Sequence, residues 1–177
     1  MSLFIMWIRI ILSVALCSID FDPETETFGD HVDTLINAAA VGKSVTFPRP
    51  SYDGKWLLYS YADFWLMNLE DGSTHPLEKA NSEYTESFHN WSSDSHWILS
   101  ASRRGDSLYS CIYIAEIDDD GNASKAFLLP QKDPSFYHKT LFTFNVPDFT
   151  KGKVKFNANA AYSYAFSDKR TQLTVKS

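Results

Sequence analysis

Two adjacent arginines, Arg103 and Arg104, and the nearby Asp106 form the segment of this chain best suited to binding a partner. Each guanidinium group presents several hydrogen-bond donors in a fixed plane, an arrangement that matches the carboxylates of another protein. The segment is also an insertion relative to an earlier copy of an internal repeat, and loops inserted into a rigid scaffold commonly carry binding residues. The competing interpretation is a solvated hairpin loop that binds nothing.

A second polar group surrounds the connection between the two copies of the repeat. Glu86 follows Glu78 and Glu83 there, and a plain polar loop is the alternative to a binding surface. His89 lies next to Asn90 on an expected inner strand, where a hydrogen-bonded core histidine is favoured over a contact on the top face. The candidate binding residues are therefore Arg49, Glu86, His89, Asn90, Arg103 and Arg104.

The motifs of several catalytic and ligand-binding classes are missing. Gly-x-Ser-x-Gly, which marks the nucleophile of many hydrolases, does not occur, and no two of the five histidines have the i, i+4 spacing of a zinc site. Residues 42–44, Gly-Lys-Ser, lack the earlier glycine of a phosphate-binding loop, because Asn37 occupies that position. Residues 118–122 indicate an acidic hairpin turn, since Phe127 would stand where a calcium loop needs its bidentate acid. We expect no catalytic residue, no metal and no cofactor.

An internal repeat organises the chain. Residues 51–58, Ser-Tyr-Asp-Gly-Lys-Trp-Leu-Leu, return 41 positions later as residues 92–99, Ser-Ser-Asp-Ser-His-Trp-Ile-Leu. Self-similarity at a period of about 40–50 residues is typical of the four-stranded blades of a β-propeller. The aromatic content of 15% also suits strands that pack through flat rings. The repeat is defined by Ser51, Asp53, Gly54, Trp56, Ser92, Asp94 and Trp97.

The predicted fold class is all-β: a partial β-propeller of about two complete four-stranded antiparallel blades plus flanking half-blades. The complete blades cover residues 44–77 and 87–130, in which short apolar strands are separated by turns rich in Gly, Asp and Pro. Upstream, residues 18–21 and 32–36 predict two strands of an incomplete blade.

The downstream flank is predicted to start a third blade. Residues 142–147 would form its inner strand, with Phe144 in the place that Phe88 takes in the preceding blade. Val154 and Phe156 then alternate with polar residues, as they would in a strand.

The paired serine–aspartate–tryptophan segments, each followed by an aromatic-aliphatic strand and an acidic–glycine turn, resemble the repeats of TolB-type β-propellers. Residues 86–97, with 102–104 behind them, and residues 145–149 are similar to TolB-family propeller proteins of Bacteroidetes-like bacteria. The resemblance covers roughly residues 17–150. It implies a six-bladed propeller in the cell envelope that binds proteins and has no catalytic role. With only two complete blades, this chain would be either the C-terminal portion of a longer propeller or an internally shortened copy.

Composition divides the chain into three parts. Residues 1–16 form an apolar segment that is either a secretory signal or membrane anchor, or a first strand; a membrane span needs about 20 apolar residues. Residues 17–150 form the propeller fragment. Residues 151–177 form a basic tail with six Lys or Arg and one acid, whereas residues 1–150 hold ten basic and 21 acidic residues. This acidic balance argues against nucleic acid as a partner.

We expect a non-enzymatic module that mediates protein–protein interaction in the periplasm or at the cell envelope, with membrane association through residues 1–16 if these form an anchor. One alternative is the propeller domain of a peptidase or hydrolase whose catalytic part lies outside this chain. Another is a shortened propeller completed by self-association, because exposed blade faces are apolar. Cys17 and Cys111 are expected to remain thiols, since they fall in blades too far apart for a bridge.

Overall fold

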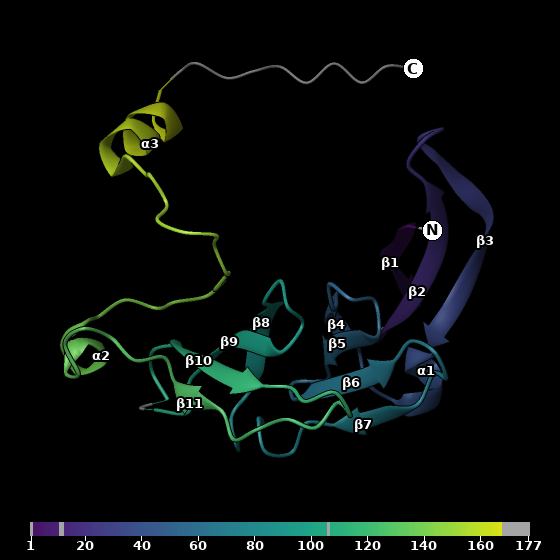
Figure 1. The fold of residues 1–177 in the computed structure, drawn as a ribbon, viewed down its shortest axis with the longest axis horizontal. Coiled ribbons are helices and arrows are strands. Elements are labelled where there is room, and N and C mark those ends of the chain that lie inside the picture. The colour runs from purple at the N-terminus through teal and green to yellow at the C-terminus, as the bar shows by residue number, and fades with distance from the viewer. Residues whose placement is uncertain (1, 11–12, 106, 168–177) are drawn as a thin grey trace.

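The computed structural model describes residues 2–10, 13–105 and 107–167 of the 177-residue chain. Its strands form three antiparallel sheets, one with three strands and two with four. The two four-stranded sheets lie side by side in the lower part of Figure 1, and the N-terminal sheet and the C-terminal segment extend away from them on opposite sides. The predicted all-β fold with two complete propeller blades is confirmed.

The first blade is a meander whose second strand is buried on both faces. Trp56 and Leu58 of this strand pack toward the second blade, while Leu57 and Tyr59 pack toward the N-terminal sheet. A strand covered on both sides needs no alternation of polar and apolar residues, which explains the continuous apolar run in the sequence. The strands, in spatial order, are β4 (Thr46–Pro50), β5 (Trp56–Ser60), β6 (Phe64–Asn68) and β7 (Thr74–Pro76).

The second blade repeats this meander, and its innermost strand contacts the innermost strand of the first blade. The blade predicted at residues 87–130 agrees with the structure to within one or two residues at its ends, the usual uncertainty of strand ends. The strands are β8 (Glu86–Trp91), β9 (Trp97–Ser102), β10 (Cys111–Glu116) and β11 (Phe127–Leu128).

The N-terminal sheet has longer strands than the sequence predicts. β2 (Ser13–Asp22) lies between β1 (Ser2–Ile10) and β3 (Thr27–Ile36), so the short strands expected at residues 18–21 and 32–36 are parts of ten-residue strands. The β2–β3 hairpin rises away from the blades at the right of Figure 1. A one-turn helix, α1 (Ala38–Val41), then leads into the first blade. Cys17 of β2 and Cys111 of β10 are not joined in a disulfide, as predicted.

None of the helices in the described part of the chain is long and apolar enough to span a membrane.

The prediction of a third blade is wrong for the described residues. Residues 142–147 form no strand, and instead of a ladder the backbone N–H of Phe144 donates to the carbonyl of Ser110, at 2.9 Å. Val154 and Phe156 lie in irregular chain before a helix, α3 (Ala158–Ala165). Alternation describes only side chains, whereas a strand also needs a neighbour that accepts its backbone hydrogen bonds. A single helical turn, α2 (Phe136–Lys139), precedes this segment.

The repeated motif builds the same turn in both blades. Ser51 Oγ accepts from the backbone N–H of Trp56 (3.0 Å) and donates to the carboxylate of Asp53 (2.6 Å). Ser92 makes the same two bonds, to the N–H of Trp97 (2.9 Å) and to Asp94. Each serine side chain therefore stabilises, by hydrogen bonds within the turn, the connection between the inner strand and the second strand of its blade.

Trp56 fills the space between the blades. It is 8% exposed, and a Cβ atom at Gly121 of the second blade would lie 2.7 Å from its Cη2 atom. Gly121 also has a φ of 81°, so only glycine suits this place on both counts. The ring of His75 meets that of Trp56 edge-on, and its Nε2–H donates to the Gly121 carbonyl at 3.0 Å. Trp97, the equivalent of Trp56, is only half-buried.

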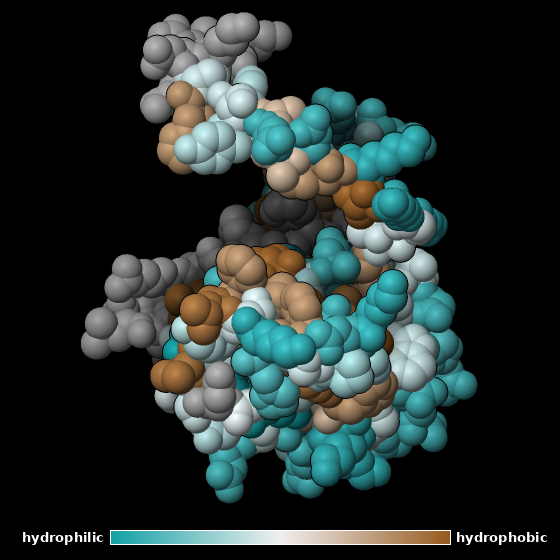
Figure 2. Space-filling view, turned by 90° about the vertical axis from the view of Figure 1, so that its left-hand side faces the viewer, coloured by the Kyte–Doolittle hydropathy of each residue, from teal (hydrophilic) through white to brown (hydrophobic). Residues whose placement is uncertain are grey.

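Large apolar side chains are exposed on the second blade and on the chain that follows it. Figure 2, which looks onto the side of the molecule at the left of Figure 1, shows apolar residues among polar ones on this surface. They include Leu108, Phe127, Leu128, Leu141 and Phe142.

Candidate functional site

The innermost strands of both blades contain the same backbone distortion. The strand pairing slips between Thr46 and Arg49 in β4 and between Ser87 and Asn90 in β8, as in a β-bulge. Inside these bulges Phe47 and Phe88 have φ angles of 53° and 51°, in the left-handed region that bulky side chains rarely adopt. Their rings pack together with centroids 4.6 Å apart. Strained residues of this kind concentrate at functional sites.

A cleft opens beside Phe88. Its volume is about 470 Å³. Three parts of the chain form it: the start of β8, the insertion between β9 and β10, and the segment after the second blade. Besides Phe88, the insertion's Ser107 has a positive φ, of 65°, so two strained residues line this one cleft. The lining residues are Tyr84, Thr85, Ser87, Phe88, Arg103, Ser107, Ser110 and Asn145.

The two adjacent arginines have different environments. The Arg104 guanidinium bonds to Glu86 and to the Ala80 carbonyl, both at 2.8 Å, and stacks 4.6 Å from the centre of the Tyr113 ring. Arg103 is exposed and lines the cleft, and within the described part of the chain its side chain has no hydrogen bond or ion pair. Asp106, which the sequence groups with them, lies outside the described residues. Of these two neighbours, Arg103 is therefore the one whose guanidinium is available to a partner.

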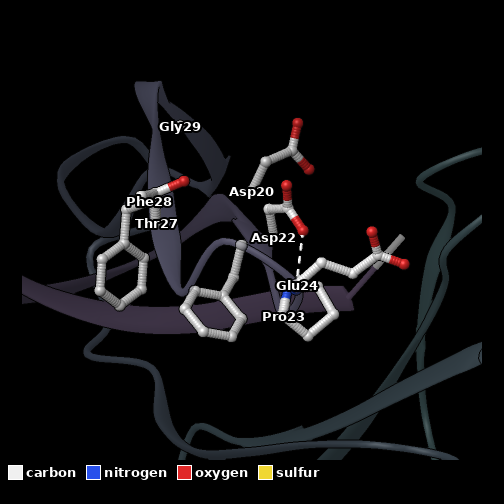
Figure 3. Close-up of a pocket in the computed structure, with 8 residues that line it drawn as sticks. Asp20, Asp22, Pro23, Glu24, Thr27, Phe28 and Gly29 are labelled. Atoms are coloured by element: carbon white, nitrogen blue, oxygen red, sulfur yellow. Dashed lines mark hydrogen bonds between the residues drawn. The ribbon is translucent and has the colours of Figure 1, made fainter.

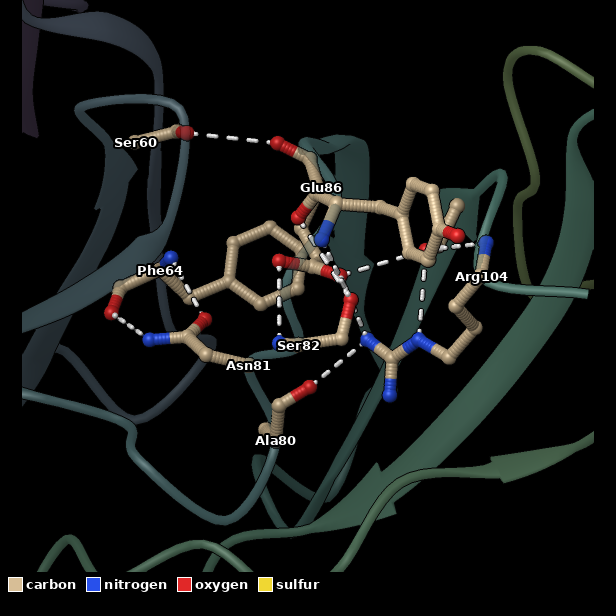
Figure 4. Close-up of polar contacts among 9 residues, drawn as sticks. Ser60, Phe64, Ala80, Asn81, Ser82, Glu86 and Arg104 are labelled. Carbon is tan, nitrogen blue, oxygen red and sulfur yellow. Dashed lines mark hydrogen bonds and ion pairs between the residues drawn. The ribbon is translucent and has the colours of Figure 1, made fainter. Parts of the chain in front are cut away.

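Glu86, predicted as a surface binding residue, is fully buried. One of its carboxylate oxygens accepts from Arg104 (2.8 Å), from Ser82 Oγ (2.5 Å) and from Ser102 Oγ (3.1 Å), as Figure 4 shows. A buried charge needs such a set of partners to offset its lost hydration. Glu86 and Arg104 thus form an internal ion pair that fixes the back of the cleft, rather than a surface for a partner.

His89 is also internal, in agreement with the favoured interpretation of the sequence. It is 1% exposed, and its Nε2–H donates to the carbonyl of Leu58 in the first blade, at 3.2 Å. Burial lowers the pKa of His89 to about 4, and the charge of Arg49 acts in the same direction, while the hydrogen bond to Leu58 opposes them. The imidazole is therefore neutral near pH 7 and joins the two blades.

Asn90 and Arg49 tie the inner strands to the segment after the second blade. Arg49 Nε donates to Asn90 Oδ1 at 3.1 Å, and Asn90 Nδ2 donates to the carbonyl of Pro147 at 2.7 Å. The Arg49 side chain is exposed, whereas the backbone carbonyl of Arg49 accepts a hydrogen bond from Trp91 Nε1 at 3.0 Å. These bonds hold the neighbouring Asn145 at the rim of the cleft.

The fold of this chain is similar to that of a protein of known structure. The structure is similar to the crystal structure of TolB from Acinetobacter baumannii, with a TM-score of 0.51 and 16% sequence identity over 69% of this chain. The fold is TolB-like. This chain spans 29% of the length of that TolB structure, and at this identity the likeness concerns the fold alone. No family model and no curated protein matches the sequence.

A second hollow, of about 430 Å³, lies outside the TolB-like blades, at the tip of the β2–β3 hairpin. Figure 3 shows the carboxylates of Asp20, Asp22 and Glu24 there, and the ring of Phe28 at the opposite side of the view. The backbone N–H of Glu24 and the side chain of Thr25 hold the pKa of Asp22 below its usual value. Only one exposed hairpin forms this hollow, whereas three parts of the chain and the buried Glu86–Arg104 ion pair support the cleft beside Phe88. No described group of His, Cys, Asp and Glu side chains is arranged to hold a metal ion.

Sequence reasoning identified Arg103 but missed most of the cleft. Tyr84, Ser107 and Ser110 belong to loops whose residues carry no distinctive motif, and Asn145 was noted only as part of a predicted strand and of the TolB-like segment 145–149. Only the folded chain brings these residues together. One signal was available: Phe47 and Phe88 occupy equivalent positions in the repeat, on the same inner strands as the candidate residues Arg49, His89 and Asn90.

Proposed function

We propose that this chain is a non-catalytic, TolB-like propeller module that binds another protein at the bacterial cell envelope. The TolB-like fold supports the proposal, because stacked blades provide a rigid scaffold on which loops carry binding residues. The observation that carries it is the cleft beside Phe88, where two strained residues and an exposed arginine with no bond among the described residues meet at the inner strand of the second blade.

The cleft has the features of a protein-binding surface. The aromatic rings of Tyr84 and Phe88 supply apolar contact area, and Arg103 supplies the residue type that, with aromatics, dominates binding energy at interfaces. The Glu86–Arg104 pair and the Asn90–Pro147 bond hold these residues in place, so little order has to be created when a partner binds.

Site-specific photocrosslinking tests the proposal. A photoreactive residue replaces Ser110 at the cleft or, as a control, Lys125, which is exposed on the outer side of the second blade. Both variants are irradiated with envelope and cytoplasmic extracts of the source organism. We expect one protein adduct that forms only from position 110 and only with the envelope extract. Equal adducts from both positions, or none from position 110, would contradict the proposal.

Self-association is a second candidate, and the exposed apolar surface of Figure 2 favours it. The half-buried Trp97 supports this candidate, because its equivalent Trp56 is covered by the next blade. Multi-angle light scattering on the whole chain tests it: we expect species heavier than the 20.1 kDa chain, and fewer of them in Phe127→Asp. A monomer at all concentrations would exclude this candidate.

A further inference from the structure

We infer that the cleft beside Phe88 holds a single carboxylate of a partner polypeptide on the guanidinium of Arg103. This inference rests on the proposed function and names the chemistry that the partner presents. It follows from the charges and donors that surround the cleft.

Arg103 is the one guanidinium that lines the cleft. Arg104, the neighbour in sequence, is already neutralised by Glu86 at 2.8 Å, so the cleft carries one uncompensated positive charge among its described lining residues. A planar guanidinium can bind a carboxylate through two parallel hydrogen bonds, which is both stronger and more specific than a neutral contact.

The remaining polar lining consists of hydrogen-bond donors that suit a carboxylate. Ser87, Ser110 and Thr85 carry hydroxyl groups, and Asn145 carries an amide that is exposed at the rim. No aspartate or glutamate is among the described lining residues, so none of them competes for Arg103. Tyr84 and Ser107 already bond to each other through their hydroxyl groups, at 3.1 Å, and close one side.

The charge of the rest of the chain limits the ligand to one carboxylate. The chain has a net charge of −6, and its first 150 residues hold 21 acids against ten bases. An acidic tract or a doubly charged phosphate would be repelled by this field. A single acidic side chain flanked by apolar residues would bond to Arg103 and place its neighbours against Phe88 and Tyr84.

Titrations with short peptides test the inference on the whole chain by NMR. The probe is the capped peptide Gly-Phe-Glu-Phe-Gly, and its control has Gln in place of Glu. We expect the Glu peptide to shift the resonances of Arg103 and Ser110 and to bind at least tenfold more tightly than the Gln peptide. Inorganic phosphate is titrated separately, and we expect it to bind more weakly than the Glu peptide.

Two matched variants separate the cleft from general charge effects. Arg103→Gln removes the guanidinium proposed to bind the carboxylate, and Lys125→Gln makes the same charge change at an exposed site outside the cleft. Because Arg103 is exposed and unpaired, its replacement should leave the melting temperature unchanged. We expect Arg103→Gln to lose the preference for Glu over Gln, and Lys125→Gln to keep it.

Several outcomes would overturn the inference: equal binding of the two peptides, equal losses in the two variants, tighter binding of phosphate, or no binding at all. The photocrosslinking experiment distinguishes these from a failure of the proposed function. If the adduct at position 110 still forms in Arg103→Gln, the proposed protein-binding function is retained and the inference of a carboxylate ligand is rejected. Absence of the adduct in the otherwise wild-type chain would remove the function itself.

Discussion

The backbone N–H of Asp53 donates to the hydroxyl of Ser95, 42 residues further along the chain, at 3.0 Å. Ser95 occupies, in the second blade, the turn position that Gly54 has in the first, and both have positive φ, of 63° and 76°. Ser95 therefore has a strained backbone conformation, and its side chain links the two turns by a hydrogen bond.

Replacing Ser95 should separate these two effects. Ser95→Ala keeps the strained backbone and loses the hydrogen bond, so we expect a loss of about 1 kcal/mol in the free energy of unfolding. Ser95→Gly loses the same bond but relieves the left-handed strain, so its loss should be close to zero. Urea denaturation measures both, with the exposed Ser93→Ala as control. Equal losses in the two variants would mean that the strain is negligible.

Trp56 and Trp97 should differ in their contribution to stability although they are equivalent in the repeat. Trp56 is packed between two blades, so Trp56→Ala should cost about 3–5 kcal/mol. Trp97 is half-buried on the outer blade, and Trp97→Ala should cost less than about half as much. Guanidinium melts of the two variants provide the comparison. A larger loss for Trp97→Ala would show that another surface covers it in solution.

His89 should make the stability of the protein depend on pH. Its native pKa is about 4, below the value of about 6.5 expected in the unfolded chain, so the unfolded chain binds the proton first as the pH falls. The contribution is therefore complete above about pH 6.5 and is lost progressively down to pH 4, by up to about 3 kcal/mol.

Urea melts at pH 7, 5.5 and 4.5 measure this dependence. His89→Gln, which retains a donor for the Leu58 carbonyl, should flatten it. The pKa values of Asp53 and Asp94 are both lowered from 3.8, so these groups change stability only at lower pH. Burial opposes the lowering at Asp53, but hydrogen bonds from Ser51 and Lys55 outweigh it. At Asp94 the main cause is the hydrogen bond from the Ser92 hydroxyl. An unchanged slope in His89→Gln would contradict the assignment.

The Glu86–Arg104 pair should show strong coupling in a double-mutant cycle. Glu86→Gln or Arg104→Met alone leaves a buried charge without its partner and should cost about 3–5 kcal/mol. The double variant should cost less than the sum of the two, by at least about 1 kcal/mol. The exposed pair of Asp53 and Lys55, 4.0 Å apart, is the control, and Lys55→Met should change stability by under about 0.5 kcal/mol. Additive losses at Glu86 and Arg104 would argue against a direct interaction.

The blades were predictable from the sequence because their signals are local. The turn of Ser51, Asp53 and Trp56 depends on hydrogen bonds within six residues, and the same residue types recur at Ser92, Asp94 and Trp97. The continuous apolar sequence of β5 likewise indicates, without reference to other segments, a strand that is buried on both faces.

The polar interior and the ends of the chain were not predictable in the same way. Glu86 meets Arg104 only because the register of β8, β9 and the insertion brings them together, and as separate sequence features both suggest surface charge. The alternation of Val154 and Phe156 indicated a strand, but no strand in the part of the chain that the structure describes pairs with them. The cleft shares this difficulty, since its lining comes from three separate loops or strand ends.

The backbone of Glu86 adds a consequence for ligand binding. Its N–H donates to the carbonyl of Ala62 in the first blade at 2.9 Å, and its own carbonyl accepts from Ser60 Oγ at 3.3 Å. Thr85 and Ser87, on either side of it, line the cleft. A partner that binds more tightly when these bonds are formed would be thermodynamically linked to closure of the joint between the blades, and the linkage would be reciprocal. A bound partner would slow amide hydrogen exchange at Glu86, and loosening this joint would weaken the partner's hold from a distance.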